Sequence, residues 1–142
     1  MIENILFNNE LLAIIIRSNF NKAGISFFTP DDFSQQLAFM SHSEGKIIAP
    51  HVHNPVKREV HFTKEVLILR KGKLRVDFYN DCQLYIESRI IEAGDVILLS
   101  TGGHGFKVLE DVEMFEVKQG PYAGELDKTR FNGIDEDKLE IN

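Results

Sequence analysis

Short runs of alternating apolar and polar residues, separated by turn-forming residues, limit what this chain can fold into more than any other feature. Leu74, Val76 and Phe78 alternate with polar neighbours, as in a strand that buries one face. Asn80-Asp81 then predicts a hairpin turn, and the alternation resumes over residues 84–90. Turns recur about every 8 to 12 residues, which is typical of an all-β sandwich or barrel and not of a parallel α/β sheet.

The same pattern predicts further strands along the rest of the chain, at residues 46–53, 65–70, 96–99, 106–109 and 113–119. Residues 71–73 link two of these strands, and Glu110-Asp111 predicts a turn between two others. Residues 11–17 form either a strand or a buried helix, which periodicity alone does not distinguish.

One segment near the N-terminus has the features of a helix start. Thr29 supplies a capping hydroxyl, Pro30 suits the first turn, and Asp31 and Asp32 would lie near the positive end of the helix. We therefore expect one or two short helical turns through Phe33, followed by strand rather than helix at residues 35–40.

The size of the chain, 142 residues and 16.2 kDa, predicts one domain with one core. We place a β-barrel domain at residues 1–131, with an N-terminal extension at 1–40 and the barrel itself at 41–120. Residues 132–142 are acidic and rich in turn formers, and predict a loosely attached tail.

Composition narrows the cellular setting and the partners. The longest apolar run, residues 11–16, is far shorter than the roughly 20 residues of a membrane span, and no basic segment of a secretory signal precedes it. The single Cys82 fits a reducing cytoplasm. The net charge of −6, without any cluster of Lys and Arg, argues against nucleic-acid or anionic-membrane partners.

The residues with the clearest chemical meaning are histidines and a glutamate. His51 and His53 would project from the same face of a strand. Glu65 opens the next strand, at residues 65–70, and antiparallel pairing of the two strands could place its carboxylate beside the two imidazoles. A third imidazole, His104, lies in the glycine-rich break at 101–105. Three His and one Glu suit a divalent Fe, Mn, Ni, Co or Zn ion with open positions for water or substrate.

These residues stand in an order that resembles the cupin superfamily. Gly45-x5-His51-x-His53 followed by Glu65-x6-Gly72 resembles its first motif, and Gly94-x5-Ser100-x-Gly102-x-His104 resembles its second. The resemblance implies a single-domain cupin-type jelly-roll β-barrel with a metal in its mouth. It assigns the ligands to His51, His53, Glu65 and His104.

The chain departs from the family pattern in three places. Eleven residues, 54–64, separate His53 from Glu65, which is longer than the family's usual gap and makes Glu59 a rival ligand. In the second motif Ser100 replaces a proline, and His104 comes one residue early. Val108 also stands where the family pattern often has Asn. Glycines 45, 72 and 94 also read simply as turn residues that permit positive φ.

Three further residues are candidate acids, bases or substrate-binding groups. His61 lies in the 54–64 loop, where it could act near neutral pH or be no more than part of a solvated loop. Glu116 and Lys118 share one face of the predicted last strand, and they would meet a substrate if that face points inward or lie in solvent if it does not.

The resemblance implies an enzyme that acts on a small oxygen-rich molecule, by sugar isomerase, epimerase or dioxygenase chemistry, and it is strongest to members linked to carbohydrate or polysaccharide metabolism. The alternative is a non-catalytic small-molecule-binding or sensor protein of the same fold. A homodimer is also expected, with the apolar run at 11–16 supplying a sheet edge.

Overall fold

The computed structural model describes all of residues 1–142, which form two compact units. The first unit comprises residues 1–20 and 63–142, and the second comprises residues 21–62. Each unit is described by itself below.

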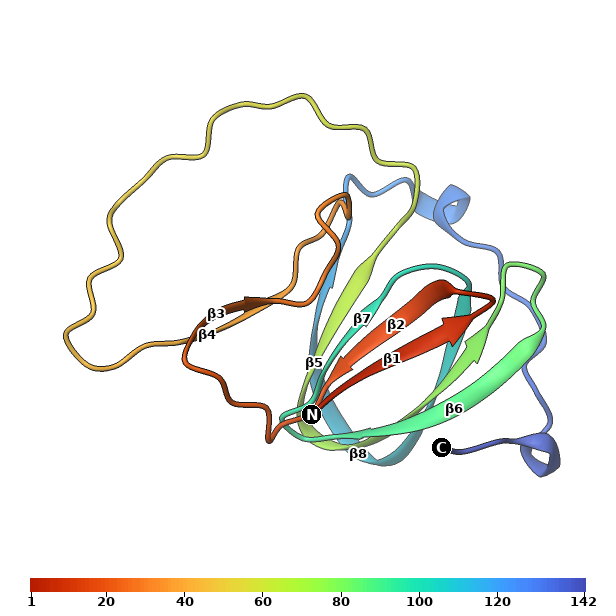
Figure 1. Cartoon of the computed structure of the whole chain (residues 1–142). Helices are drawn as coiled ribbons and strands as arrows, with labels where there is room; N and C mark the ends of the chain where they lie inside the picture. The colour runs from red at the N-terminus through yellow and green to blue at the C-terminus, as the bar shows by residue number, and fades with distance from the viewer. The chain divides into compact units, whose positions relative to one another are not determined.

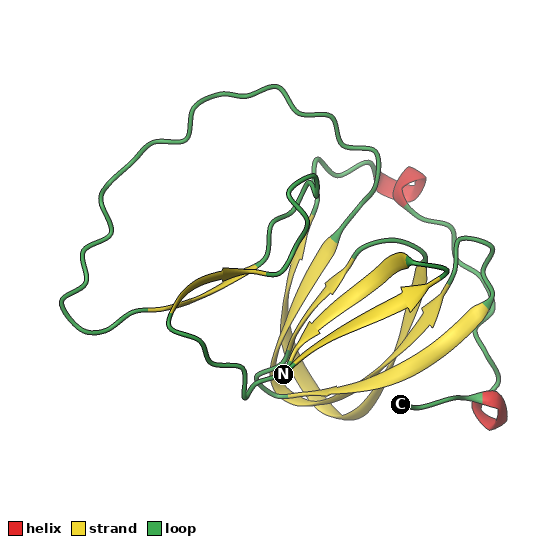
Figure 2. Ribbon diagram, in the orientation of Figure 1, coloured by secondary structure: helices red, strands yellow, loops and turns green.

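The first unit is an antiparallel sheet that curls strongly into a half-barrel (Figures 1 and 2). Its strands follow the order β1 (Ile2–Phe7), β2 (Glu10–Ile16), β7 (Val96–Leu99), β5 (Glu65–Tyr79) and β6 (Tyr85–Glu92). β8 (Gly103–Lys118) pairs with the other side of β5 along most of its length. Because β6 and β7 share one side of β5, β8 lies at an edge of the sheet.

The half-barrel depends on a bend in the long β5–β8 ribbon. The register between the two strands shifts at three places between Leu69 and Leu74, so the ladder is irregular there. At the bend Gly72 has a φ of 83°, and a Cβ at this position would lie 2.1 Å from the carbonyl oxygen of Asp111. Only glycine fits this crossing of the two backbones. The ribbon therefore turns back on itself, and both of its ends rise to the same rim (Figure 1).

The core lines the concave side of the half-barrel. In β5 the core positions are Leu67 and Leu69 before the bend, and Leu74, Val76 and Phe78 after it. The side-chain parity thus changes from odd to even at the irregularity, which keeps the apolar side chains on one face. The remaining core residues come from four other strands: Ile5, Leu12, Ala13, Ile15, Ile91, Ile97 and Leu99.

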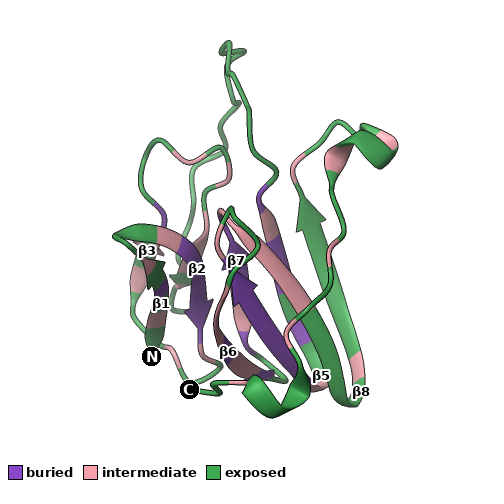
Figure 3. Ribbon diagram, turned by 90° about the vertical axis from the view of Figure 1, so that its right-hand side faces the viewer, coloured by how far each residue is buried: buried purple, intermediate pink, exposed green.

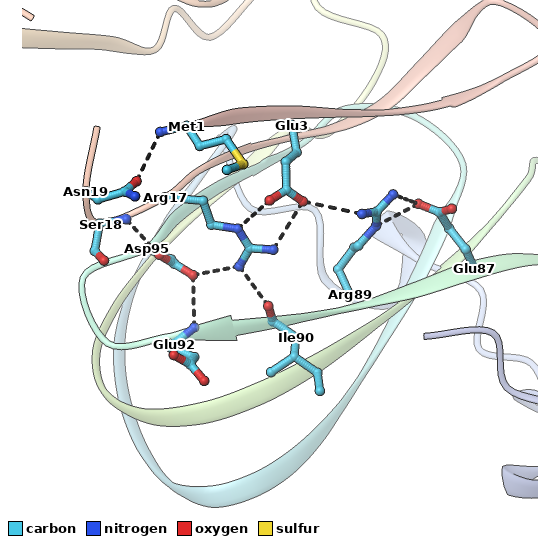
Figure 4. A network of polar contacts seen from close by, with 10 residues as sticks. All are labelled: Met1, Glu3, Arg17, Ser18, Asn19, Glu87, Arg89, Ile90, Glu92 and Asp95. Atoms are coloured by element: carbon cyan, nitrogen blue, oxygen red, sulfur yellow. Dashed lines mark hydrogen bonds and ion pairs between the residues drawn. The ribbon is translucent and has the colours of Figure 1, made fainter. Parts of the chain in front are cut away.

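Ion pairs join β1 and β6, the two ends of the strand order (Figure 4). Glu3 on β1 accepts hydrogen bonds from Arg17 at 2.6 Å and from Arg89 on β6 at 3.4 Å. Arg17 also donates to Asp95 at 2.9 Å and to the carbonyl oxygen of Ile90 at 2.8 Å. These contacts hold together two strands that share no backbone ladder, and so maintain the curl of the sheet.

The C-terminal residues are bound to the outer face of the half-barrel, so the prediction of a loosely attached tail is wrong. The C-terminal segment contains two short 3₁₀ helices, Gly124–Asp127 and Glu136–Lys138, and the second lies on this face. Arg75 donates to Glu136 at 2.8 Å, and the backbone N–H of Ser88 donates to the carbonyl oxygen of Glu140 at 2.8 Å. The tail thereby covers the buried Arg75–Asp77 ion pair. The positive charge of Arg75 attracts the Glu136 carboxylate and so stabilises the tail on this face.

The second unit contains a hairpin of β3 (Gly24–Phe27) and β4 (Ala38–Ser41). The helix predicted at residues 29–33 is wrong. The Thr29 hydroxyl does not cap a helix; it donates to Gln36 at 2.7 Å and accepts from the N–H of Leu37 at 3.2 Å. Residues 30–33 form a turn closed by the Phe33 N–H and the Pro30 carbonyl at 3.1 Å.

The strand predicted at residues 46–53 is also wrong, since residues 42–62 contain no regular strand. The expected antiparallel pairing with residues 65–70 has a physical obstacle. Both edges of Glu65–Ile68 are already occupied, one by β7 and the other by β8.

Several other sequence predictions are confirmed. The chain is mostly β, residues 96–99 form β7, and the hairpin at Asn80-Asp81 joins β5 to β6.

Other predictions are corrected in part. The open choice at residues 11–17 resolves as β2, a strand paired on both sides, so this run supplies no free edge for a dimer. Two pairs of predicted strands are each one continuous strand, β5 and β8, and the turn predicted at Glu110-Asp111 is instead part of the bend. None of the helices has the length and apolar character needed to cross a bilayer.

Candidate functional site

A carboxylate and an imidazole meet at the rim of the half-barrel. Glu65 is the first residue of β5 and His104 the second residue of β8. In the ladder Glu65 lies opposite Lys118 and His104 lies opposite Phe78, so the two residues sit near opposite ends of the same ribbon. The bend nevertheless brings the Nε2 of His104 to 3.4 Å from the Oε2 of Glu65.

Two more charged groups join this pair from the end of β8. The Nζ of Lys118 lies 3.5 Å from the Oε1 of Glu65 and 3.3 Å from Glu116. Glu116 lies opposite the core residue Leu67, and Lys118 lies opposite Glu65, so both side chains are on the concave face. The sequence left this orientation open. We call Glu65, His104, Glu116 and Lys118 the mouth cluster.

The electrostatics of the mouth cluster favour an ionised Glu65. The hydrogen bond from His104 lowers the pKa of the Glu65 carboxyl most, and the charges of His104 and Lys118 lower it further, against burial, which raises it. In turn the negative charge of Glu65 raises the pKa of Lys118. Only 12% of the Glu65 side chain and 28% of the His104 side chain are exposed, so both groups are partly shielded from solvent.

The other two predicted ligands, His51 and His53, lie in the second unit. Their ring centroids are 5.2 Å apart with the planes at 72°, and both residues are exposed. The Nδ1 of His51 lies 3.0 Å from the carbonyl oxygen of Ala49. The rival Glu59 lies 3.7 Å from the Nε2 of His61, and that pair is also exposed.

The four predicted ligands therefore form two close pairs, one in each unit. Within neither unit do three or more His, Cys, Asp or Glu side chains form a group that could hold a metal ion. The structure joins Glu65 with His104 and His51 with His53, and the complete four-ligand site remains a proposal.

The Glu65–His104 pair has a spacing that suits a shared metal ion. Metal–nitrogen and metal–oxygen bonds of about 2.0–2.2 Å place two neighbouring ligand atoms about 2.8–3.1 Å apart in octahedral geometry and about 3.3–3.6 Å apart in tetrahedral geometry. The 3.4 Å between Nε2 and Oε2 lies in the tetrahedral range. The nitrogen and oxygen donors, without thiolate, also suit first-row divalent ions.

Comparison of the chain with protein-family models, with curated proteins and with solved structures gives no match.

The sequence did not reveal that Lys118 would be the cross-strand partner of Glu65. No local signal could have revealed it, because this pairing joins residues far apart in the chain and depends on the irregular register at the bend.

Proposed function

We propose that this chain is a cupin-type jelly-roll protein that binds a divalent metal in the mouth of its barrel and acts on a small oxygen-rich molecule. The ligands would be Glu65 and His104 from the mouth cluster, together with His51 and His53. The 3.4 Å approach of Glu65 and His104 carries the proposal, because the resemblance assigns these residues from two separate motifs as ligands of one ion.

The proposed chemistry is that of a sugar isomerase or epimerase, or of a dioxygenase, in the cytoplasm. A bound metal would supply Lewis-acid polarisation of a substrate oxygen. The Lys118 ammonium would donate a hydrogen bond to a substrate oxygen, and the partly exposed Glu116 carboxylate would accept a proton beside it. His61, on its exposed loop, remains the candidate acid or base from the second unit.

A non-catalytic binding protein is the alternative. One observation favours it: the Lys118 ammonium lies 3.5 Å from Glu65 and already provides this carboxylate with a positive partner. In that case the mouth cluster would bind a small polar ligand directly, through the His104 imidazole and the Lys118 ammonium.

Metal analysis after anaerobic purification tests the proposal. The wild type should hold a transition metal, and the Glu65→Gln and His51→Ala/His53→Ala variants should lose most of it. His42→Ala is the matched control, since His42 is an exposed histidine outside the proposed ligand set. Equal metal in all four proteins would contradict the ligand assignment.

Turnover assays separate the enzyme from the binding protein. The metal-loaded wild type should convert at least one compound in a panel of sugars, keto acids and diols, and Lys118→Met should lower that rate while metal content stays the same. A rise in melting temperature with one ligand, without turnover, would favour the binding protein.

A further inference from the structure

Two glycines directly precede the His104 imidazole of the mouth cluster. Gly103 is the first residue of β8, and it lies opposite Tyr79 at the end of β5. Gly102 has a φ of 70°, and a Cβ there would lie 2.3 Å from the carbonyl oxygen of Tyr79, so this close approach requires glycine. Neither glycine has a side chain that could pack on the sheet and hold this end of β8. The position of His104 therefore depends on contacts that other parts of the chain supply.

An aromatic ring from the C-terminal segment covers Gly103. A Cβ at Gly103 would lie 3.0 Å from the Cζ and 3.2 Å from the Cε1 of Phe131, so the tip of the ring lies against the glycine backbone. The same ring contacts Tyr79 edge-on, with the centroids 5.0 Å apart and the planes at 84°. An aromatic side chain that covers a glycine stabilises a sheet where the glycine alone weakens it.

The C-terminal segment is fixed on the sheet just beyond Phe131. The N–H of Ile134 donates to the Tyr79 hydroxyl at 2.9 Å, and Glu136 accepts from Arg75 at 2.8 Å. The chain between the two 3₁₀ helices passes in front of the sheet in Figure 3. Tyr79 is only 4% exposed, so its ring and hydroxyl offer the segment a fixed surface. The contact of Phe131 with the start of β8 thus belongs to an anchored part of the chain.

Phe131 and the His104 imidazole lie on opposite faces of the sheet. His104 is opposite the core residue Phe78, so its side chain is on the concave face with the rest of the mouth cluster. Tyr79 follows Phe78 in β5 and so points to the other face, where it meets Phe131. The Phe131 ring therefore lies outside the mouth, and it acts on the site through the backbone at Gly103.

We propose that Phe131 is a positioning residue for His104: its ring holds Gly103 on the sheet and so keeps the imidazole at Glu65. This role rests on the proposed function, in which His104 and Glu65 bind one metal ion. The backbone opens readily at the end of a strand, and adjacent glycines increase this tendency. The 3.4 Å approach of Nε2 and Oε2 joins residues near opposite ends of the β5–β8 ribbon, so a small displacement at Gly103 separates the pair.

Proton NMR of the metal-free, full-length protein tests this role without any metal. The wild type should show a nuclear Overhauser cross-peak between the imidazole protons of His104 and the γ protons of Glu65. Phe131→Ala should lose this cross-peak while its circular dichroism stays unchanged, because the ring is outside the core. Phe131→Met should keep the cross-peak, since the long, adaptable methionine side chain reaches nearly as far as the ring.

Three further variants separate positioning from general stability. Ile91→Val removes a methyl group from the core, so it should lower the free energy of unfolding and leave the cross-peak intact. Leu126→Ala changes an apolar residue of the C-terminal segment that is 93% exposed, and it should alter neither quantity. In the Phe131→Ala background, Gly103→Ala should restore the cross-peak, because the added Cβ would lie 3.4 Å from the Cβ of Tyr79 and pack there in place of the ring.

A Phe131→Ala variant that keeps the cross-peak, or an Ile91→Val variant that loses it as well, would overturn the proposal. Loss of circular dichroism in Phe131→Ala would also overturn it, because the ring would then support the whole sheet. Zn²⁺ binding relates the role to the proposed function: Phe131→Ala should weaken it by about tenfold, as loss of a group that orients a ligand does. If the wild type binds no Zn²⁺ while the cross-peak still depends on Phe131, the proposed function fails and the positioning role stands.

Discussion

Substitution of Gly72 by alanine tests the bend on which the mouth cluster depends. Gly72 has a φ of 83°, and an added Cβ would lie 2.1 Å from the carbonyl oxygen and 2.7 Å from the carbonyl carbon of Asp111. Both contacts are with backbone, so no side chain can move aside to relieve them. The two strands must separate at the bend.

The expected loss of stability has two parts. A left-handed backbone with a Cβ costs about 1–2 kcal/mol, offset in part by the lower entropy of the unfolded chain. Separating β5 from β8 also breaks about two ladder hydrogen bonds at about 1 kcal/mol each. The free energy of unfolding should therefore fall by about 3 kcal/mol, a large part of the roughly 5–15 kcal/mol of a typical domain.

Urea unfolding followed by circular dichroism measures this change against a matched control. Gly124 is in the same unit and also has a positive φ, 68°, but a Cβ there would meet nothing within 4 Å. Gly124→Ala should therefore cost only about 1 kcal/mol. Equal losses for the two variants would refute the argument that a backbone contact fixes the bend.

Three further outcomes concern the outer face of the half-barrel. Arg75→Met should lower the free energy of unfolding by about 3–5 kcal/mol in urea titrations, because it leaves the buried Asp77 without its partner, and Asp77→Asn in the same background should restore part of the loss. Hydrogen bonds from Arg75 and Lys107 lower the pKa of Glu136 to about 2. The stabilisation by this carboxylate is therefore fully present above pH 4.5 and is lost as the pH falls from 4.5 toward 2. Across that range the melting temperature of Glu136→Gln should fall less steeply than that of the wild type. Deletion of residues 134–142 should lower the melting temperature and speed hydrogen exchange at the Ser88 amide, and an unchanged exchange rate would show that the tail does not bind there.

That the chain is mostly β could be predicted, because this depends on local alternation. Val76 and Phe78 show which face of their strand is buried, and the turn at Asn80-Asp81 fixes the next pairing. The bend at Gly72 could not be predicted in the same way. In the sequence, Gly72 between two lysines indicates a turn that would end one strand and begin another. In the structure, the backbone of Asp111 from β8 approaches Gly72, and the residue lies at a bend within one continuous strand.

The site was predictable only in part, for a related reason. The motifs identified Glu65 and His104 as neighbours, and the structure places them 3.4 Å apart. The strand expected at 46–53 failed because alternation and glycine punctuation do not show whether a neighbouring edge is free. Both edges of Glu65–Ile68 are taken by β7 and β8, strands that lie later in the chain.

Nitrogen-detected NMR of the histidine side chains during titration with Zn²⁺ tests the central claim most directly. The Nε2 resonance of His104 should move on metal addition together with resonances of His51 and His53, while the resonances of His42 stay unchanged. In Glu65→Gln the His104 shift should require a higher metal concentration. A His104 resonance that stays fixed while other histidines of the wild type bind the ion would contradict a metal site in the mouth of the half-barrel.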